Sequence, residues 1–235
     1  MSRKNSWLTL FQEDKEGSPP QTVDWQARFD DLSRKAKKAP LLDYYHTPLP
    51  DDTTPIKEVK LLALDLETTG MDPETDAIVS IGFVPFTIKG IKLDRACHML
   101  VKPEMPLSKE SAAIHTITHT ELSNAQGFHV RFNTLLSAMK HHIPVVHYHA
   151  MERQFLANSV DRFFSDRFEF PMIDTMMVED RLMSRKRKPG LIQRWLGAIR
   201  GNRQPPHAFS LRLDAVRHRY HLPRYTPPHA LTAAV

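Results

Sequence analysis

The sequence predicts an α/β fold in which helices cover the faces of a mixed sheet. Two observations lead to this prediction. Residues 59–67 are almost continuously apolar, as expected of a strand that is covered on both faces. Further along the chain, helical and strand patterns alternate, which is typical of a sheet flanked by helices. The expected strands are residues 59–67, 77–86, 96–101, 143–147 and 171–173, and the expected helices are residues 132–141, 150–164 and 175–183.

Composition narrows the class of protein. Apolar residues make up 41% and charged residues 25% of the 235 residues, which excludes a chain disordered throughout. Cys97 is the single cysteine, so a disulfide framework and a cysteine zinc site are both excluded within one chain. No apolar run reaches the roughly 18 residues that a membrane span needs. We therefore expect a cytoplasmic protein without a signal peptide or a membrane partner. The net charge of +5 favours polyanionic partners.

The first 58 residues differ in pattern from the rest. Trp25, Phe29 and Leu32 recur at helical spacing and predict one amphipathic helix of about 15 residues. Residues 40–55 are rich in proline and aspartate and predict an extended linker. We expect residues 1–58 to form a helical arm with its linker, and residues 59–235 to form the main domain. The arm either packs on that domain or binds a partner.

Two acids stand on the first expected strand. Residues 64–70 read LDLETTG, and Asp65 and Glu67 are two positions apart. On a strand both side chains project from one face, about 6 to 7 Å apart, and two such acids repel unless a cation lies between them. Oxygen ligands of this kind suit Mg²⁺ or Mn²⁺. The alternative is a strand end at which both acids simply reach solvent.

A third acid, Glu152, follows the strand at residues 143–147. It lies in the first turn of the expected helix. The helix dipole favours a carboxylate there by up to about 1 kcal/mol, so the position by itself requires no function.

These segments together carry a family resemblance. Residues 64–70 resemble the first motif of the DEDD 3′–5′ exonucleases, the family of the bacterial polymerase III proofreading subunit and of RNase T. Residues 115–118 resemble the family's H-x-I-T segment, and His147 with Glu152 resembles its second motif. Residues 172–175 resemble the strand-to-helix step that follows. The resemblance covers about residues 59–235.

The resemblance implies a ribonuclease H-like fold and a site for two divalent ions, Mg²⁺ or Mn²⁺. Asp65, Glu67 and Glu152 would hold the ions, and a histidine would act as general base. The terminal nucleotide would lie along a set of side chains on both sides of the site. These are Leu66, Thr68, Thr69, His115 and Ile117.

The sequence departs from the family pattern in three places. Glu152 replaces an aspartate, and Tyr148 replaces an asparagine. The last motif of the family reads H-x-A-L-x-D-A, and here either Ala233 or Ala234 takes the place of its aspartate, depending on the register. We therefore expect the domain to be cut short in its final helix and to lack the fourth acid. His229 is then the candidate base, and its alternative is an exposed histidine near a frayed terminus.

Two further features bear on partners. No acid occurs between Arg181 and Leu213, and the nine basic residues there favour contact with single-stranded nucleic acid; the alternative is a solvated surface. They are Arg181, Arg185, Lys186, Arg187, Lys188, Arg194, Arg200, Arg203 and Arg212. A zinc site in the cluster His141, His142, His147 and His149 is disfavoured, because no cysteine or clear third ligand stands beside it.

The sequence therefore predicts a metal-dependent 3′–5′ exonuclease that acts on single-stranded nucleic-acid 3′ ends. DNA is the favoured substrate over RNA, and the absent aspartate predicts weak activity. The alternative is a catalytically degenerate module that binds single strands or a polymerase or another protein partner. Purified protein incubated with a labelled oligonucleotide and a divalent ion separates the two.

Overall fold

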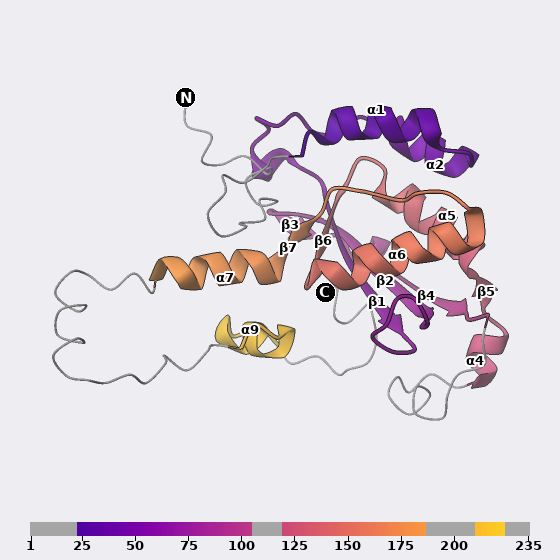
Figure 1. Cartoon of the computed structure of the whole chain (residues 1–235). Helices are drawn as coiled ribbons and strands as arrows, with labels where there is room; N and C mark the ends of the chain where they lie inside the picture. The colour runs from indigo at the N-terminus through magenta and orange to yellow at the C-terminus, as the bar shows by residue number, and fades with distance from the viewer. Residues whose placement is uncertain (1–22, 105–118, 187–209, 224–235) are drawn as a thin grey trace, which may run out of the picture. The chain divides into compact units, whose positions relative to one another are not determined.

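The computed structural model describes residues 23–104, 119–186 and 210–223 (Figure 1). The chain divides into two compact units. The first comprises Met1–Asp174 with Tyr225–Val235, and the second comprises Thr175–Arg224. Each unit is described by itself. In the described segments, no helix is long and apolar enough to cross a membrane.

The first unit is built on a mixed sheet, which confirms the predicted fold class. Within its described residues the sheet has seven strands, in the order β5-β4-β2-β1-β6-β7, with β3 paired to β2. The central strand β1 is antiparallel to β2 and parallel to β6, and β6 is parallel to β7. The strands are β1 Leu61–Thr68, β2 Ile78–Thr87, β3 Gly90–Ile91, β4 Cys97–Lys102, β5 Gln126–Gly127, β6 Ile143–Val146 and β7 Ile173–Asp174.

Alternation along β1 separates the core from the acids. Leu62, Leu64 and Leu66 are buried in the main hydrophobic cluster. Asp65 and Glu67 stand at the alternate positions and therefore project from the other face of the strand. The core face is covered by apolar side chains of α5 (Phe128–Met139) and α6 (His149–Phe164). This arrangement leaves the acids on a face that the main core does not fill.

An N-terminal layer of two helices, α1 (Trp25–Lys35) and α2 (Ala39–Tyr45), completes this core. Trp25, Phe29 and Leu32 are buried, as their spacing predicts. The prediction of an extended linker from residue 40 is wrong for residues 40–45, which are helical. Pro40 stands at the start of α2, where a missing N–H costs nothing. The helix is stabilised by burial of Leu41, Tyr44 and Tyr45.

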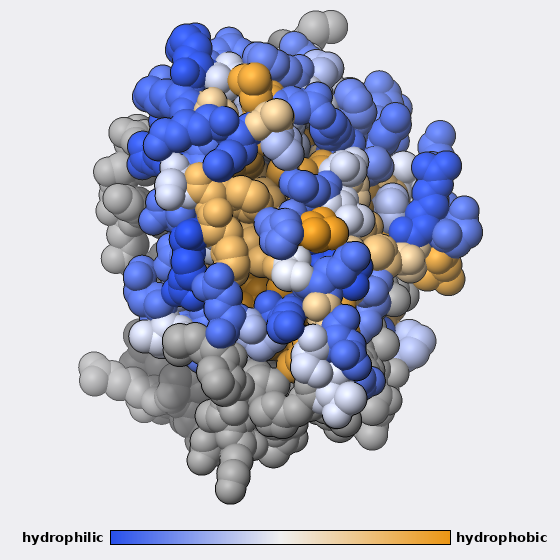
Figure 2. Space-filling model, turned by 90° about the vertical axis from the view of Figure 1, so that its right-hand side faces the viewer, coloured by the Kyte–Doolittle hydropathy of each residue, from blue (hydrophilic) through white to orange (hydrophobic). Residues whose placement is uncertain are grey.

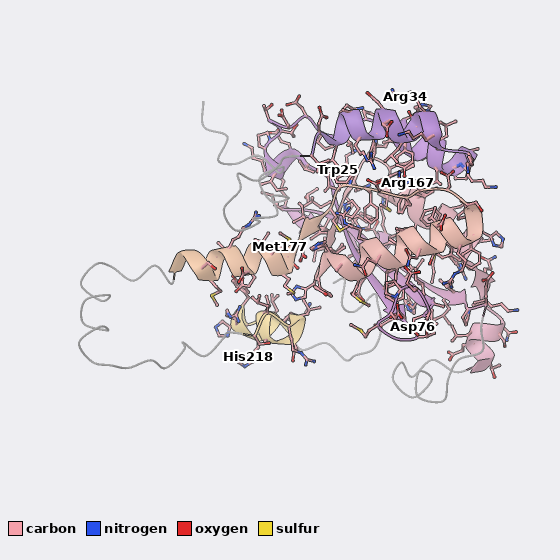
Figure 3. All side chains as sticks on the ribbon, viewed as in Figure 1. Trp25, Arg34, Asp76, Arg167, Met177 and His218 are labelled. Atoms are coloured by element: carbon pink, nitrogen blue, oxygen red, sulfur yellow. The ribbon has the colours of Figure 1, made fainter. Side chains whose placement is uncertain are left out.

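The layer binds the segment that connects α6 to β7. The Arg28 guanidinium donates two hydrogen bonds to the Glu169 carboxylate, at 2.9 and 2.5 Å. The Asp166 carboxylate accepts hydrogen bonds from the backbone N–H groups of Lys37 and Lys38. The Tyr45 hydroxyl donates to the carbonyl of Arg167 at 3.0 Å (Figure 3, where Arg167 is labelled). Residues 23–45 are therefore an integral part of the first unit, while the domain boundary at residue 58 stays a prediction.

Helix boundaries differ from the sequence in an informative way. The helix expected at residues 132–141 begins at Phe128, because Phe128 itself is buried against Phe132 and Phe163. The short elements β3, β5 and α4 (His119–Ser123) were not predicted, since two to five residues carry no periodic signal.

The side of the molecule at the right of Figure 1 is mostly hydrophilic around a smaller apolar patch (Figure 2).

The second unit contains α7 (Thr175–Lys186) and α9 (Leu213–Arg219) among its described residues. Glu179 on α7 is buried and holds these two helices together. Its carboxylate pairs with the Arg219 guanidinium and accepts a hydrogen bond from the Tyr220 hydroxyl at 2.7 Å. A buried carboxylate needs partners of this kind, because burial of an unpaired charge is costly.

We predict that Phe29→Ala lowers the free energy of unfolding by about 3 to 5 kcal/mol, because it leaves a cavity among fully buried aromatic rings. Phe29 is 0% exposed and contacts Tyr44 and Tyr45 at ring-centroid distances of 5.3 and 5.2 Å. Urea unfolding measures the change. Asp30→Ala on the exposed side of the same helix is the control and should change stability by less than about 0.5 kcal/mol. A loss below about 1 kcal/mol for Phe29→Ala would show that the layer packs only loosely.

Candidate active site

The first two acids lie near the end of β1. Asp65 pairs in register with Gly82 on β2, and Glu67 pairs with Ser80. Directly paired residues project from the same face of a sheet, so Gly82 leaves the space beside Asp65 without a side chain. The two carboxylates therefore share a face on which one neighbour is a glycine and the other a small hydroxyl.

The environment of Asp65 disfavours its charged form. Burial, and then the negative charge of Glu67, raise the pKa of Asp65 to about 8. An isolated aspartate has a pKa of about 4. The shift shows that the two acids are electrostatically coupled, as the sequence predicts for a strand that carries both on one face.

Glu152 reaches the same group of charges from α6. It lies in the first turn of that helix and is 2% exposed. Burial, the charge of Asp65 and, to a smaller degree, the charge of Asp174 raise the pKa of Glu152 well above its usual range. In the described part of the chain, its Oε2 atom is buried without a hydrogen-bond partner. Such an atom is the feature that a bound cation would satisfy.

The turn between β6 and α6 determines where Glu152 lies. Tyr148 precedes the helix with φ 81° and ψ 74°, in the left-handed region that non-glycine residues rarely adopt. Asp174, at the end of β7, accepts hydrogen bonds from the N–H groups of Tyr148 and His149 at 3.1 and 2.9 Å. Its Oδ2 also lies 2.7 Å from Nδ1 of the His149 imidazole.

The loop after β1 is closed by its own hydroxyls. The Thr68 hydroxyl donates to the carbonyl of Gly70 at 2.5 Å, and the Thr69 hydroxyl donates to Asp76 at 2.8 Å. A Cβ atom at Gly70 would overlap the Asp76 carboxylate, so a larger residue would have to push that side chain away from Thr69. Figure 3 labels Asp76 in this loop. The two threonines thus fix the shape of the loop that borders the acids.

The donor set fits a hard divalent ion. The charge of Glu67 raises the pKa of Asp65, the charge of Asp65 raises the pKa of Glu152, and Oε2 of Glu152 has no hydrogen-bond partner among the described residues. A cation would relieve both conditions. Within the described ranges, however, no three His, Cys, Asp or Glu side chains already converge as a metal-binding group. Water or substrate oxygens would therefore have to supply some of the ligands.

Several predicted site residues lie outside the described residues, namely His115, Ile117 and His229. Leu66 is buried in the core face of β1. Of the histidine cluster, His142 bonds to the carbonyl of Lys140 through Nδ1, and His149 bonds to Asp174. These rings therefore have different partners.

Sequence reasoning missed two polar residues on the acidic face. Ser80 is fully buried, and its hydroxyl lies 2.7 Å from Nε2 of His98. His98 pairs in register with Gly82, which in turn pairs with Asp65, so these three residues form one row across the sheet. Neither residue belongs to a motif, and only the register of the strands brings them to the site.

Comparison with known proteins places this site in a family. A family model described as Exonuclease, that of RNase T, matches residues 62–208. The PolC-type DNA polymerase III of Thermotoga maritima is 31% identical over 135 residues, which are 57% of this chain and 10% of that protein. The same enzyme of Thermotoga petrophila is 30% identical over 122 residues, which are 52% of this chain and 9% of that protein. The chain thus spans about a tenth of these relatives.

Solved structures share the fold. Cell-death related nuclease 4 superimposes with a TM-score of 0.56 at 17% identity, covering 74% of this chain and 60% of that one. The zinc-bound complex of E. coli exonuclease I with single-stranded DNA gives a TM-score of 0.58 at 15% identity, covering 75% of this chain and 38% of that one. The nuclease domain of 3′hExo, a DEDDh family member, gives 0.51 at 16% identity and covers 74% and 86%.

We predict that Asp65→Asn stabilises the metal-free protein at pH 7 to 8 by about 1 to 4 kcal/mol and has little effect near pH 4. The folded protein keeps the proton of Asp65 up to about pH 8. The unfolded chain releases it near pH 4, so the free energy of unfolding falls as pH rises between these values. Urea unfolding with a chelator, at several pH values, measures this slope. Asp94→Asn, at an exposed position, is the control. An unchanged slope in Asp65→Asn would contradict the prediction.

Proposed function

The chain belongs to the RNase T exonuclease family, and from this membership we propose that it is a metal-dependent 3′–5′ exonuclease with DNA as its preferred substrate. The observation that carries the proposal is the coupling of Asp65, Glu67 and Glu152 at one edge of the sheet. The carboxyl ends of β1 and β6 meet there, and open sheets of this kind bind ligands at such edges.

The site would bind two divalent ions, Mg²⁺ or Mn²⁺, through the carboxylates of Asp65, Glu67 and Glu152. Bound ions of this kind stabilise the attacking and leaving oxygens of an in-line phosphoryl displacement. The orphaned Oε2 of Glu152 supports its place in the set. Asp65 lies between the other two electrostatically, since its charge couples to both. This central place in the coupling supports Asp65 as a ligand of the site.

The loop after β1 and two further segments would receive the 3′-terminal nucleotide. Thr68 and Thr69 shape that loop through their hydroxyls. Leu66, which is buried in the core, would lie along the nucleotide with them, while His115 and Ile117 would flank the base or sugar. His229 would accept the proton of the attacking water. These roles come from the family resemblance.

The departures in the last motif predict a slow enzyme. With alanine in place of the fourth acid, ions are held by fewer carboxylates. Loss of one preorganised electrostatic element costs about 10²- to 10³-fold in rate. Mn²⁺ should support activity better than Mg²⁺, because Mg²⁺ demands nearly ideal octahedral geometry.

A second candidate function is a non-cleaving module that binds single strands or a polymerase. The alanines at 233 and 234 favour it. The curated relatives are PolC-type polymerases, of which this chain spans about a tenth, so a polymerase is the protein partner that we propose. Binding of an oligonucleotide without its shortening would favour this function over the enzyme.

We predict Mn²⁺-dependent shortening of a 5′-labelled single-stranded DNA from its 3′ end, abolished by a chelator. The Asp65→Ala, Glu67→Ala double variant should lose at least about 10²-fold in rate, because two carboxylates of the ion site are removed. Gel resolution of the products gives the direction of cleavage. Asp94→Ala, at an exposed position, is the matched control. Equal activity in the double variant and the wild type would reject the site.

We also predict that the basic stretch from Arg181 to Arg212 contributes to DNA affinity. Replacing Arg185, Lys186, Arg187 and Lys188 with glutamine should flatten the slope of log affinity against log salt concentration, because fewer counterions are released. Fluorescence anisotropy with a labelled oligonucleotide measures the slope. A slope equal to that of the wild type would show that these four residues make no contact with the nucleic acid.

A further inference from the structure

Asp174 and His149 form a pair beside the acidic site that the proposed chemistry does not use. The Asp174 side chain is 5% exposed and that of His149 is 26% exposed. We propose that the pair is a positioning device: it fixes the first turn of α6 and thereby the carboxylate of Glu152. The inference rests on the proposed function, in which Glu152 holds a divalent ion.

The contacts of Asp174 join a strand to the start of a helix. Its carboxylate accepts from the N–H groups of Tyr148 and His149 and from the imidazole Nδ1–H, at 3.1, 2.9 and 2.7 Å. A carboxylate only accepts, so the imidazole must carry the proton on Nδ1. Three bonds to two consecutive residues leave the start of α6 little freedom to move.

The strand that carries Asp174 is itself fixed relative to Asp65. Asp174 pairs in register with Val146 on β6, and Val145 pairs with Ala63 on β1. The strands therefore set the distance between Asp174 and the strand that carries Asp65. Through its hydrogen bonds, Asp174 fixes the start of α6 relative to these strands, and the first turn of α6 contains Glu152.

The backbone of Tyr148 is in a strained conformation, with a positive φ, that the surrounding contacts must maintain. A non-glycine residue in the left-handed region costs of the order of 1 to 3 kcal/mol and persists only where the surroundings determine it. Both N–H groups that flank the Tyr148 Cα bond to Asp174. The strained turn redirects the chain from β6 into α6, and Glu152 lies three residues after His149 on the same side of the helix.

The same contacts argue against Asp174 as the missing fourth ligand. Both oxygens of this carboxylate already accept hydrogen bonds from the start of α6, and the side chain is only 5% exposed, so an ion has little access to it. Groups that orient the ligands of a metal, without touching it, typically contribute about 10- to 100-fold to metal affinity or activity. That is the effect we expect of this pair.

A calorimetric titration of the full chain with Mn²⁺ alone, which measures the dissociation constant, tests the inference. Asp174→Asn and His149→Ala should weaken Mn²⁺ binding about 10- to 100-fold. His149→Asn should stay within about 3-fold of the wild type, because its amide N–H can replace the imidazole Nδ1–H. If Asp174→Asn does not fold, the two His149 variants decide, since they change only the side-chain bond.

Asp166→Asn is the matched control. Asp166 is also buried and accepts three backbone N–H bonds, from Lys37, Lys38 and Arg167, at 2.7, 3.2 and 2.9 Å. Asp166→Asn should lower the melting temperature about as much as Asp174→Asn, yet leave Mn²⁺ affinity within about 2-fold. A merely structural role for Asp174 predicts that the two variants behave alike.

The outcomes separate this inference from the proposed function. Wild-type affinity for Mn²⁺ in Asp174→Asn or His149→Ala overturns the inference, and so does equal weakening by Asp166→Asn. Cleavage by the wild type would still support the exonuclease in both cases. Conversely, the expected pattern of Mn²⁺ affinities in a protein that cleaves no oligonucleotide supports the pair and overturns the exonuclease.

Discussion

Acidic side chains gather near the carboxyl end of β1, on the face opposite its buried leucines, and the surrounding elements have to hold them there. Burial and nearby negative charges raise the pKa values of Asp65 and Glu152. Both positions are therefore unfavourable for a charged carboxylate. The register of β1 with β2 fixes Asp65 opposite a glycine, and a hydrogen-bonded turn fixes the start of α6. The fold thus stores a repulsion that a divalent cation would relieve.

The frame around the site extends further in the sequence than the family match. The elements that carry Glu152 and Asp174 are joined by residues 165–172, and the N-terminal layer binds that connection through Arg28 and Tyr45. The layer lies before residue 62, where the match begins. Its helices are therefore a feature of this chain beyond the matched region, coupled by packing to the same helix and strand that form the site.

Hydrophobic patterns in the sequence predicted the elements whose position depends mainly on nearby residues. The apolar run of β1 and the spacing of Trp25, Phe29 and Leu32 are both confirmed. Helix α2 was not predictable, because its buried tyrosines are stabilised by distant rings such as that of Phe168. The contact between Asp174 and His149 spans 25 residues and depends on strand register, which composition does not encode. At the site, the sequence predicted three acids but not the row that joins Asp65 to His98.

The binding of the N-terminal layer to the α6–β7 connection has a consequence for how the domain can be isolated. Phe168 and Phe170 are 2% and 0% exposed, and the ring of Phe168 lies against that of Tyr44 in α2. A fragment that begins at residue 59 would uncover this aromatic surface together with the hydrogen-bonding groups of Asp166 and Glu169. Exposed apolar patches of this kind promote self-association. A fragment that begins where the family match begins would accordingly aggregate. Absence of nuclease activity in such a fragment would therefore not show that the site is inactive.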